Sequence, residues 1–274
     1  MIQHPVRSRD ARFQQWQALL TNRVKRHRTG RYLVQGVRPI TMAVRNGAVI
    51  ETLLRPYGGR LSAWAGQIVA DAGAEVVEVA PDLLAELADK DSPELVAVAE
   101  LPADDLARLP VGPDMLVVVF DRPTSPGNIG TLIRSADAFG ATGVVVTGHA
   151  ADPYDPRAVR ASTGSLFALP VVRTEAADVL GWLDRLRAEE PVRLLGTDES
   201  GDTEIGAADL TGPRVLAVGN ETTGLSAAWR SACDTLLRIP ISGTASSLNA
   251  AVAGSLTLYE AARQRRAKTG PKEH

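Results

Sequence analysis

Six short apolar runs in the second half of the chain constrain the fold more than any other feature. Each is apolar along its whole length and rich in Val or Leu, as strands buried on both faces of a parallel sheet are. Helical patterns lie between them, at residues 128–140, 175–190 and 225–234. The alternation predicts a Rossmann-like α/β domain with a parallel sheet. The runs are "MLVVVFD" (115–121), "GVVVTG" (143–148), "LPVVR" (169–173), "RLLGTD" (193–198), "RVLAVGN" (214–220) and "TLLRIPI" (235–241).

The first hundred residues also alternate between helical and strand patterns, but with shorter elements. Residues 12–28 read as one helix, with Phe13, Trp16 and Val24 among the apolar residues on one side. A Pro-bearing polar stretch, "LPADDLARLPVGPD", separates this part from the apolar runs. We therefore expect a small α/β domain over residues 1–106 and a second domain over residues 107–274.

The composition indicates a soluble globular protein, with 45% apolar and 23% charged residues among 274. The single cysteine, Cys233, excludes an internal disulfide and a multi-cysteine metal site. No apolar run reaches the roughly 18 residues that a membrane span needs. The N-terminal residues lack the apolar core of a signal peptide. We expect a cytoplasmic protein without a membrane partner.

Charge is distributed unevenly along the chain, although the net charge is only −2. Residues 1–45 hold ten Lys and Arg against one acid, whereas residues 71–106 hold eleven acids against one Lys. Such asymmetry is typical of a protein with one face toward a polyanion. The alternative, that these are ordinary solvated helices, stays open on charge alone.

Polar residues and glycines gather at the carboxyl ends of three apolar runs, where ligands bind in parallel α/β sheets. The loops are "FDRPTSPGNIGTLIRSADAFG" (120–140), "AVGNETTGLS" (217–226) and the stretch after "RIPI" that ends in "SSLN". Familiar nucleotide fingerprints are absent: no G-x-G-x-x-G follows a strand, and Leu225 stands where a phosphate-binding loop needs Lys. The four histidines have no metal-ligand spacing, so we expect no metal.

Together the three loops resemble the three motifs of the SpoU (TrmH) branch of the SPOUT methyltransferases, over residues 114–266. The first motif is an Asn followed six residues later by an Arg, here Asn128 and Arg134. The second is a Gly-x-Glu-x-x-Gly turn, here "GNETTG" with Glu221. The third is Ile-Pro at a strand end followed by Ser-Leu-Asn, here Ile239 to Asn249. The first domain is similar, more loosely, to the ribosomal-protein-L30e-like domain that often precedes this catalytic domain.

The resemblance implies a SPOUT fold with a trefoil knot and S-adenosylmethionine-dependent 2′-O-methylation of a ribose in RNA. It implies 23S rRNA as the target, and a homodimer formed by the helices at 224–232 and 249–266. Methyltransferases that confer resistance to avilamycin or thiostrepton share this two-domain layout, so antibiotic resistance is one role that the resemblance implies. Two alternatives remain open: a tRNA 2′-O-ribose methyltransferase, and a non-catalytic RNA-binding or ribosome-assembly factor.

The resemblance also assigns residues to the site. The expected catalytic residues are Arg134, Asn128, Glu221, Ser247 and Asn249. The expected cofactor-binding residues are Thr197, Gly219, Asn220, Ile239, Ile241, Ser247 and Leu248. The expected RNA-binding residues are Arg23, Lys25, Arg26, Arg28 and Arg160.

Arg134 is the residue most expected to act in the chemistry. A guanidinium is a reluctant base, because its pKa lies above about 12. We therefore expect Arg134 to bind a phosphate and stabilise the developing alkoxide. Asn128 either orients Arg134 or the ribose, or caps the helix that follows it. Glu221 holds either Arg134 or a backbone donor, and Asn249 either orders the Ser247 loop or receives the substrate hydroxyl.

Overall fold

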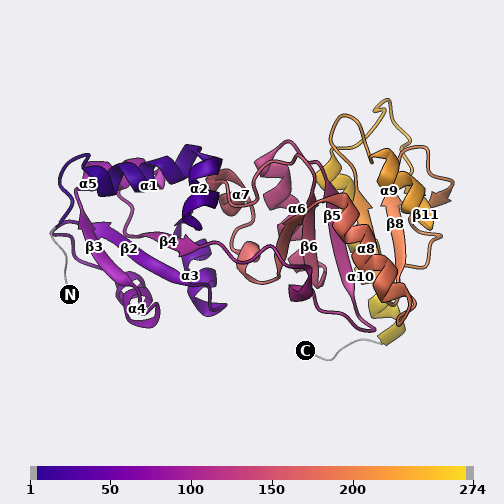
Figure 1. The fold of residues 1–274 in the computed structure, drawn as a ribbon, viewed down its shortest axis with the longest axis horizontal. Coiled ribbons are helices and arrows are strands. Elements are labelled where there is room, and N and C mark those ends of the chain that lie inside the picture. Colours follow the sequence, from indigo (N-terminus) through magenta and orange to yellow (C-terminus); the bar gives the residue numbers. More distant parts are fainter. Residues whose placement is uncertain (1–4, 270–274) are drawn as a thin grey trace. The chain divides into compact units, whose positions relative to one another are not determined.

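The computed structural model describes residues 5–269, and the chain divides into two compact units. The first unit comprises Met1–Pro102 together with Asp152–Ala168. The second comprises Ala103–Ala151 and Leu169–His274. Figure 1 shows the two sheets on which they are built. The sequence predicts a single boundary at 106/107, whereas the segment Asp152–Ala168 packs with the first unit despite its position in the chain.

The first unit holds a four-stranded sheet in the order β1-β4-β2-β3. β4 pairs antiparallel with β1 and β2, and β3 pairs parallel with β2. Its core packs Phe13, Leu33, Leu54, Leu84 and Val98 together. The strands are β1 (Arg31–Gln35), β2 (Ile50–Pro56), β3 (Glu75–Val79) and β4 (Val96–Glu100).

The single helix expected over residues 12–28 is two helices in the structure. Asn22 ends the first, and its side chain accepts a hydrogen bond from Lys25 N and so caps the second. The change of direction leaves Val24 exposed instead of on the buried face. The helices of this unit are α1 (Ala11–Thr21), α2 (Arg23–Thr29), α3 (Val37–Arg45), α4 (Ala63–Asp71), α5 (Pro81–Ala88) and α7 (Pro156–Ala161), with a 3₁₀ turn η2 (Ser165–Phe167).

A buried ion pair ties the segment Asp152–Ala168 to the first unit. The Arg26 Nε donates to Asp152 Oδ2 at 2.8 Å, and both side chains are only 2% exposed. Arg26 Nη1 also donates to the Leu19 carbonyl at 2.8 Å. The ring of Tyr154 packs against that of Tyr32, with centroids 4.9 Å apart. The segment is therefore an integral part of this unit's core.

The second unit is an α/β domain around a seven-stranded sheet in the order β7-β6-β5-β10-β8-β11-β9. Every neighbouring pair in it is parallel, which confirms the predicted fold class. The trefoil knot stays a prediction. The strands are β5 (Leu116–Asp121), β6 (Gly143–Thr147), β7 (Val171–Thr174), β8 (Arg193–Thr197), β9 (Thr203–Glu204), β10 (Arg214–Val218) and β11 (Thr235–Arg238).

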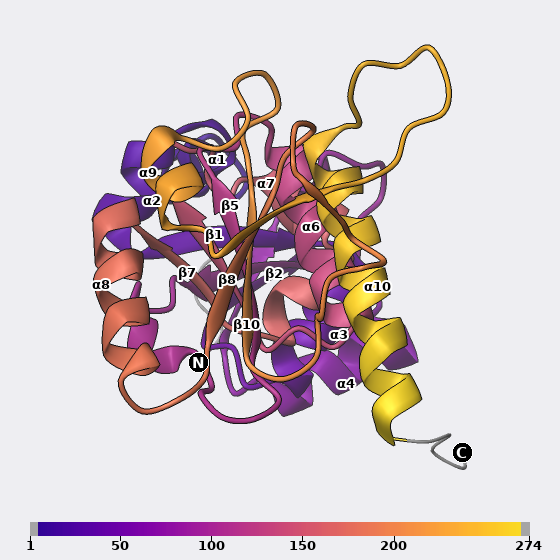
Figure 2. The same cartoon turned by 90° about the vertical axis from the view of Figure 1, so that its right-hand side faces the viewer.

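Helices cover both faces of this sheet, which is why its central strands β5, β6 and β10 are buried along their whole length. Figure 2 shows α8 and α9 on one face and α6 and α10 on the other. Val117 and Val119 of β5 pack in one core with Trp182 of α8 and Trp229 of α9. The helical elements are η1 (Leu106–Arg108, a 3₁₀ turn), α6 (Pro126–Ala138), α8 (Ala176–Arg187), α9 (Ala227–Ala232) and α10 (Ala250–Thr269).

The last helix, expected over residues 249–266, begins one residue later in the structure. Residues 239–249 are a loop, and α10 starts at Ala250. Asn249 Oδ1 accepts a hydrogen bond from Val252 N at 3.2 Å, so its side chain caps the helix. Ser246 and Ser247 are left exposed in the loop.

Candidate active site

Three polar loops of the second unit meet at the carboxyl edge of the parallel sheet. They follow β5, β10 and β11 and span residues 122–125, 219–226 and 239–249. β5 and β10 are neighbours in the sheet, so their loops emerge side by side. A parallel sheet places the carboxyl ends of its strands at one edge, which is the reason that loops distant in sequence gather there.

The Glu221 carboxylate, on the second loop, bonds directly to the first loop and reaches the third through Asn128. It accepts hydrogen bonds from Asn128 Nδ2 at 2.9 Å, from Thr124 N at 3.0 Å and from Ser125 N at 3.2 Å. Asn249 Nδ2 then donates to Asn128 Oδ1 at 3.2 Å. One residue from each of the three motifs therefore takes part in a single network.

Two opposing effects act on the pKa of Glu221. Burial of the carboxyl would raise its pKa, but hydrogen bonds from Asn128, Thr124 and Ser125 outweigh burial and lower it below the ordinary value of 4.5. The charged form is thus the one that the network stabilises. Of the two roles expected for Glu221, it holds backbone donors, and its hydrogen-bond partners do not include Arg134. Likewise Ser125, not Asn128, caps α6.

A second set of contacts, centred on Arg122, fixes the loop that carries Glu221. We name residues 219–224 the glutamate loop. Arg122 Nη2 donates to the Gly224 carbonyl at 3.0 Å, and Arg122 Nε donates to Asp121 Oδ2 at 3.1 Å. Asn220 Nδ2 donates in turn to the Arg122 carbonyl at 2.7 Å. Arg122 adopts a left-handed backbone conformation, with φ of 52°, which is uncommon for a residue with a side chain.

Within the glutamate loop, backbone hydrogen bonds join its two ends. Asn220 and Gly224 exchange two such bonds, of 3.0 and 3.1 Å. Gly219 has no space for a side chain, because a Cβ there would lie 2.3 Å from the Gly224 carbonyl carbon and the Leu225 nitrogen. The loop is therefore closed on itself as well as anchored to Arg122 and Asn128.

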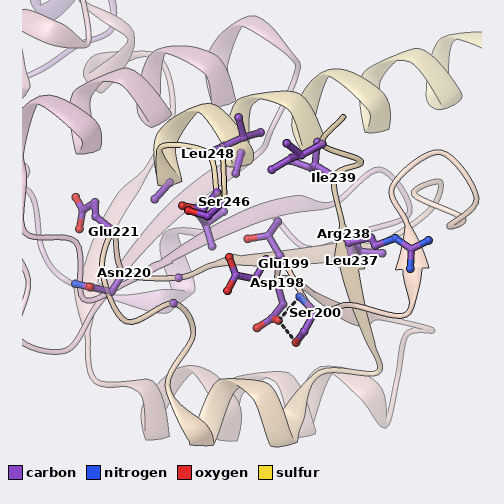
Figure 3. Close-up of a pocket in the computed structure, with 18 of the residues that line it drawn as sticks. Asp198, Glu199, Ser200, Asn220, Glu221, Leu237, Arg238, Ile239, Ser246 and Leu248 are labelled. Atoms are coloured by element: carbon purple, nitrogen blue, oxygen red, sulfur yellow. Dashed lines mark hydrogen bonds between the residues drawn. The ribbon is translucent and has the colours of Figure 1, made fainter. Parts of the chain in front are cut away.

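A cavity of about 730 Å³ opens between the glutamate loop and the loop after β11. This size lies in the range of sites for small molecules and cofactors, roughly 300 to 1,000 Å³. Figure 3 shows residues that line it, with Asp198 and Glu199 near the centre of the view, Asn220 to the left and Arg238 to the right. All seven expected cofactor-binding residues line it: Thr197, Gly219, Asn220, Ile239, Ile241, Ser247 and Leu248.

The wall made by residues 239–248, which we name the open loop, is bonded quite differently. Within residues 5–269 its backbone makes no hydrogen bond to other backbone groups. Its residues from Pro240 onward are exposed, including Ile241 at 39% and Leu248 at 36%. Unpaired N–H, C=O and hydroxyl groups therefore border the cavity and are available to a ligand.

Arg134 lies on α6, outside the residues that line the cavity. Its side chain is exposed, and in the described part of the chain it makes no hydrogen bond or ion pair. The neighbouring Ser135 hydroxyl accepts a hydrogen bond from Ser255 of α10 at 2.7 Å, which fixes this part of α6. The guanidinium is thus free to bind a substrate group.

One of the five expected RNA contacts is wrong. Arg26 is 1% exposed and bonded to Asp152, so its side chain is not accessible to RNA. Arg23 and Arg28 on α2 are exposed, and Lys25 is half-buried. Arg160 lies on α7 in the first unit and pairs with Asp89 at 2.8 Å. A sequence cannot reveal that one residue of a basic block has a buried partner far along the chain.

Several residues of the site were not anticipated from the sequence. Arg122 anchors the glutamate loop, and Asp198, Glu199, Arg230 and Arg238 line the cavity. A signal existed for two of them, because "DES" directly follows the apolar run "RLLGT" at a strand end. Applying the strand-end rule to that fourth loop would have found them.

The described residues give no support to metal or thiol chemistry. Within residues 5–269 no group of three or more His, Cys, Asp or Glu side chains could hold a metal ion. Burial raises the pKa of the Cys233 thiol to about 12, so it is a poor nucleophile. None of the helices in this range is long and apolar enough to cross a membrane.

Comparison with known proteins agrees with this geometry. Residues 115–259 match the SpoU rRNA Methylase family, and residues 10–97 match the SpoU L30e-like domain. The chain is 56% identical over 264 residues to the 23S rRNA (uridine(2479)-2′-O)-methyltransferase of Streptomyces viridochromogenes, covering 95% of this chain and 92% of that protein.

Two solved structures are also similar along almost the whole chain. The SpoU methyltransferase AviRb from Streptomyces viridochromogenes in complex with AdoMet has a TM-score of 0.89 and 56% identity, covering 93% of this chain and 98% of that one. An AdoMet-bound rRNA methyltransferase from Sinorhizobium meliloti has a TM-score of 0.85 and 31% identity, covering 95% and 97%.

The fold and the three-loop site define an RNA methyltransferase that uses S-adenosylmethionine. The chain belongs to the SpoU rRNA Methylase family, and the prediction of that family from the three motifs is confirmed. The cavity suits the cofactor: its volume accommodates a nucleoside with an amino-acid arm, and the unpaired groups of the open loop can bind an adenine and a ribose.

Proposed function

We propose that this enzyme methylates the 2′-hydroxyl of one ribose in 23S rRNA. The observation that carries the proposal is the network in which Glu221 joins Asn128 and, through it, Asn249 beside the cofactor cavity. The similarity to a relative named for this reaction supports the choice of RNA. The test is transfer of labelled methyl groups to total RNA, followed by primer extension at limiting dNTP. One stop within 23S rRNA is expected. Label in tRNA alone, or no label, would contradict the proposal.

The roles of the site residues follow from their positions. The cofactor, when bound, supplies a methyl group on a positively charged sulfur. The open loop, with Ser247 and Leu248, and the glutamate loop bind the cofactor from two sides. Glu221 and Asn249 hold Asn128 in place, and Asn128 in turn orients the ribose. Preorganised positions of this kind lower the barrier because the reacting groups no longer have to be aligned.

Arg134 binds a phosphate next to the target ribose and stabilises the negative charge that develops on its 2′-oxygen. Its exposure and its lack of partners within residues 5–269 support this role. Loss of a preorganised electrostatic donor costs about 100-fold in turnover. We therefore expect Arg134→Lys to lower single-turnover methyl transfer by about 100-fold without changing cofactor affinity in calorimetry. Arg185→Lys, on the α8 face of the sheet, is the matched control. Wild-type transfer by Arg134→Lys across the pH range would refute the need for a planar guanidinium.

The first unit acts as the RNA platform through the exposed basic residues of α2. Arg23 and Arg28 are the main contacts, together with Lys25 and with Arg160 of α7. The logarithm of the RNA-binding constant falls linearly with the logarithm of the salt concentration. Removal of one side chain that binds a phosphate should make the slope of that line shallower by about one unit. Arg23→Ala and Arg28→Ala are tested by filter binding over a range of KCl concentrations. An unchanged slope in the double variant would show that Arg23 and Arg28 of α2 do not bind RNA phosphates.

We also propose a homodimer, formed through α10. Val252, Leu256 and Tyr259 are exposed at 43%, 39% and 48%, and their spacing places them on one side of that helix. α9 exposes less apolar surface than α10, because its large apolar residue Trp229 is buried. Leu256→Arg should convert a dimer to a monomer in sedimentation equilibrium, and Val111→Arg, at an exposed apolar position outside α10, is the matched control. A wild-type monomer at micromolar concentration would contradict the proposal.

Two further proposals follow from the RNA target. The enzyme acts in the cytoplasm, where ribosomal RNA lies, and cell fractionation tests this. Methylation of the large-subunit RNA protects the ribosome from an antibiotic that binds near the modified ribose. Expression in a sensitive host should raise the inhibitory concentration of avilamycin or thiostrepton, and the Arg134→Lys variant should not. Equal protection by both would show that methylation is not the cause.

A further inference from the structure

Charged side chains line the cofactor cavity, and four of the five have an ion-pair or hydrogen-bond partner within the described residues. The set is Asp198, Glu199, Glu221, Arg230 and Arg238. Asp198 Oδ1 accepts hydrogen bonds from the backbone N and hydroxyl of Ser200, at 2.9 and 2.6 Å, and its other oxygen pairs with Arg230. The two charges of that pair therefore cancel each other at the cavity wall.

The other cation that lines the cavity, Arg238, also has an ion-pair partner. Arg238 Nη2 pairs with Glu204 Oε1 at 2.9 Å, and Arg238 Nη1 donates to the Gly201 carbonyl at 3.4 Å. The charge of Glu221 is stabilised by the Asn128 network at the far side of the glutamate loop. Arg238 is therefore neutralised by Glu204, whereas Glu221 keeps its negative charge but has both carboxylate oxygens bonded to neutral donors.

Glu199 differs from the other four. In the part of the chain that the structure describes, its carboxylate has no hydrogen bond and no ion pair. Its side chain is exposed and belongs to the cavity lining, where Figure 3 labels it beside Asp198. Glu199 is therefore the one carboxylate of the cavity lining that has no protein partner within residues 5–269.

The methyl donor and its product differ in charge at one atom. Before transfer the sulfur is a positively charged sulfonium, and after transfer it is a neutral thioether. A negative group in the cavity attracts the first and has no net charge to attract in the second. We propose that Glu199 is a specificity-determining residue that favours the charged methyl donor over the demethylated product. The inference rests on the S-adenosylmethionine cavity described above.

Two unreactive ligands separate the effect of charge from that of shape. Sinefungin carries an ammonium group where the donor has its methylated sulfonium, and S-adenosylhomocysteine is the neutral product. Calorimetry on the full-length enzyme gives an affinity for each. We expect Glu199→Gln to weaken sinefungin by about three- to fivefold, the range of an exposed charge pair, and to change S-adenosylhomocysteine by less than about twofold. Raising the salt concentration should reduce the preference of the wild type for sinefungin over S-adenosylhomocysteine. The preference of the variant should not change with salt.

Glu189→Gln is the matched control. It removes the same charge from an exposed position between α8 and β8, before the strand starts, and so at the opposite edge of the sheet. It should leave both affinities unchanged. Equal weakening of both ligands by Glu199→Gln, or weakening of neither, would overturn the proposal. If the wild type bound neither ligand, the cofactor cavity itself would be wrong, which is a different result.

Discussion

The two walls of the cavity are built on opposite principles. The glutamate loop is held by its own backbone bonds, by Arg122 and by the Glu221 network. The open loop, opposite it, makes no backbone hydrogen bond to other backbone groups within residues 5–269. The two loops therefore differ in how firmly they are held without a ligand. We expect the glutamate loop to be formed before any ligand arrives, and the open loop to complete its hydrogen bonds only when the cofactor is bound.

A methyl group added to the anchored wall should have the largest effect. In Gly219→Ala the new Cβ would lie 2.3 Å from backbone atoms of Gly224 and Leu225, so the loop must shift. Overpacking of this kind costs about 1–3 kcal/mol in unfolding free energy. Because the same loop forms the cavity, S-adenosylhomocysteine binding should weaken by roughly 100-fold. Calorimetry and urea denaturation measure the two effects, and near-wild-type values in both would mean that this wall is not rigid.

Removal of the clamp on the glutamate loop should have a moderate effect. Arg122→Ala deletes the bonds to Gly224 and Asp121 but leaves the backbone in place. Loss of one such hydrogen bond costs about 1 kcal/mol, or roughly fivefold in affinity. We expect S-adenosylhomocysteine binding to weaken by that factor, measured by calorimetry. Arg122→Lys should recover only part of it, because an ammonium cannot reach both acceptors. Wild-type affinity for S-adenosylhomocysteine in Arg122→Ala would show that Arg122 is not needed to hold the glutamate loop in its binding conformation.

The Glu221 network should make stability depend on pH in one direction. The pKa of Glu221 is lowered in the folded state, so its contribution is complete above its ordinary value of 4.5 and is lost as pH falls through the lowered pKa. The melting temperature of the wild type should therefore exceed that of Glu221→Gln near pH 7, and the gap should close on acidification below about pH 4.5. Thermal scans from about pH 3 to about pH 7 measure the gap. A gap that stayed constant over this range would show that the carboxylate charge does not matter.

The same methyl group placed in the open loop should have the smallest effect. A Cβ at Gly243 would have no atom within 4 Å, and its φ does not lie in the left-handed region. Gly243→Ala should change the unfolding free energy by less than about 1 kcal/mol, mainly through the unfolded chain. Cofactor affinity should stay within about twofold. A reduction comparable to that of Gly219→Ala would mean that the two walls are equally constrained.

Much of the second unit could be predicted because its determinants are local. Apolar runs mark strands and strand ends mark the three loops, and the resemblance of those loops to the SpoU motifs implies Gly219, Glu221 and Asn249. Partners could not be found in this way. Asp152 lies 126 residues from Arg26, and no local pattern pairs them. The same holds for Arg122, whose role depends on the Gly224 carbonyl 102 residues away.

Hydrogen exchange with and without S-adenosylhomocysteine tests the central claim most directly. Amide protection reports whether a backbone N–H is bonded, and it can be followed separately in the two loops. We predict that the ligand slows exchange strongly in residues 239–248 and only slightly in residues 220–224, which are already bonded to each other and to Arg122. Equal gains in both loops, or no gain in residues 239–248, would contradict an enzyme with one preformed wall and one that closes on its cofactor.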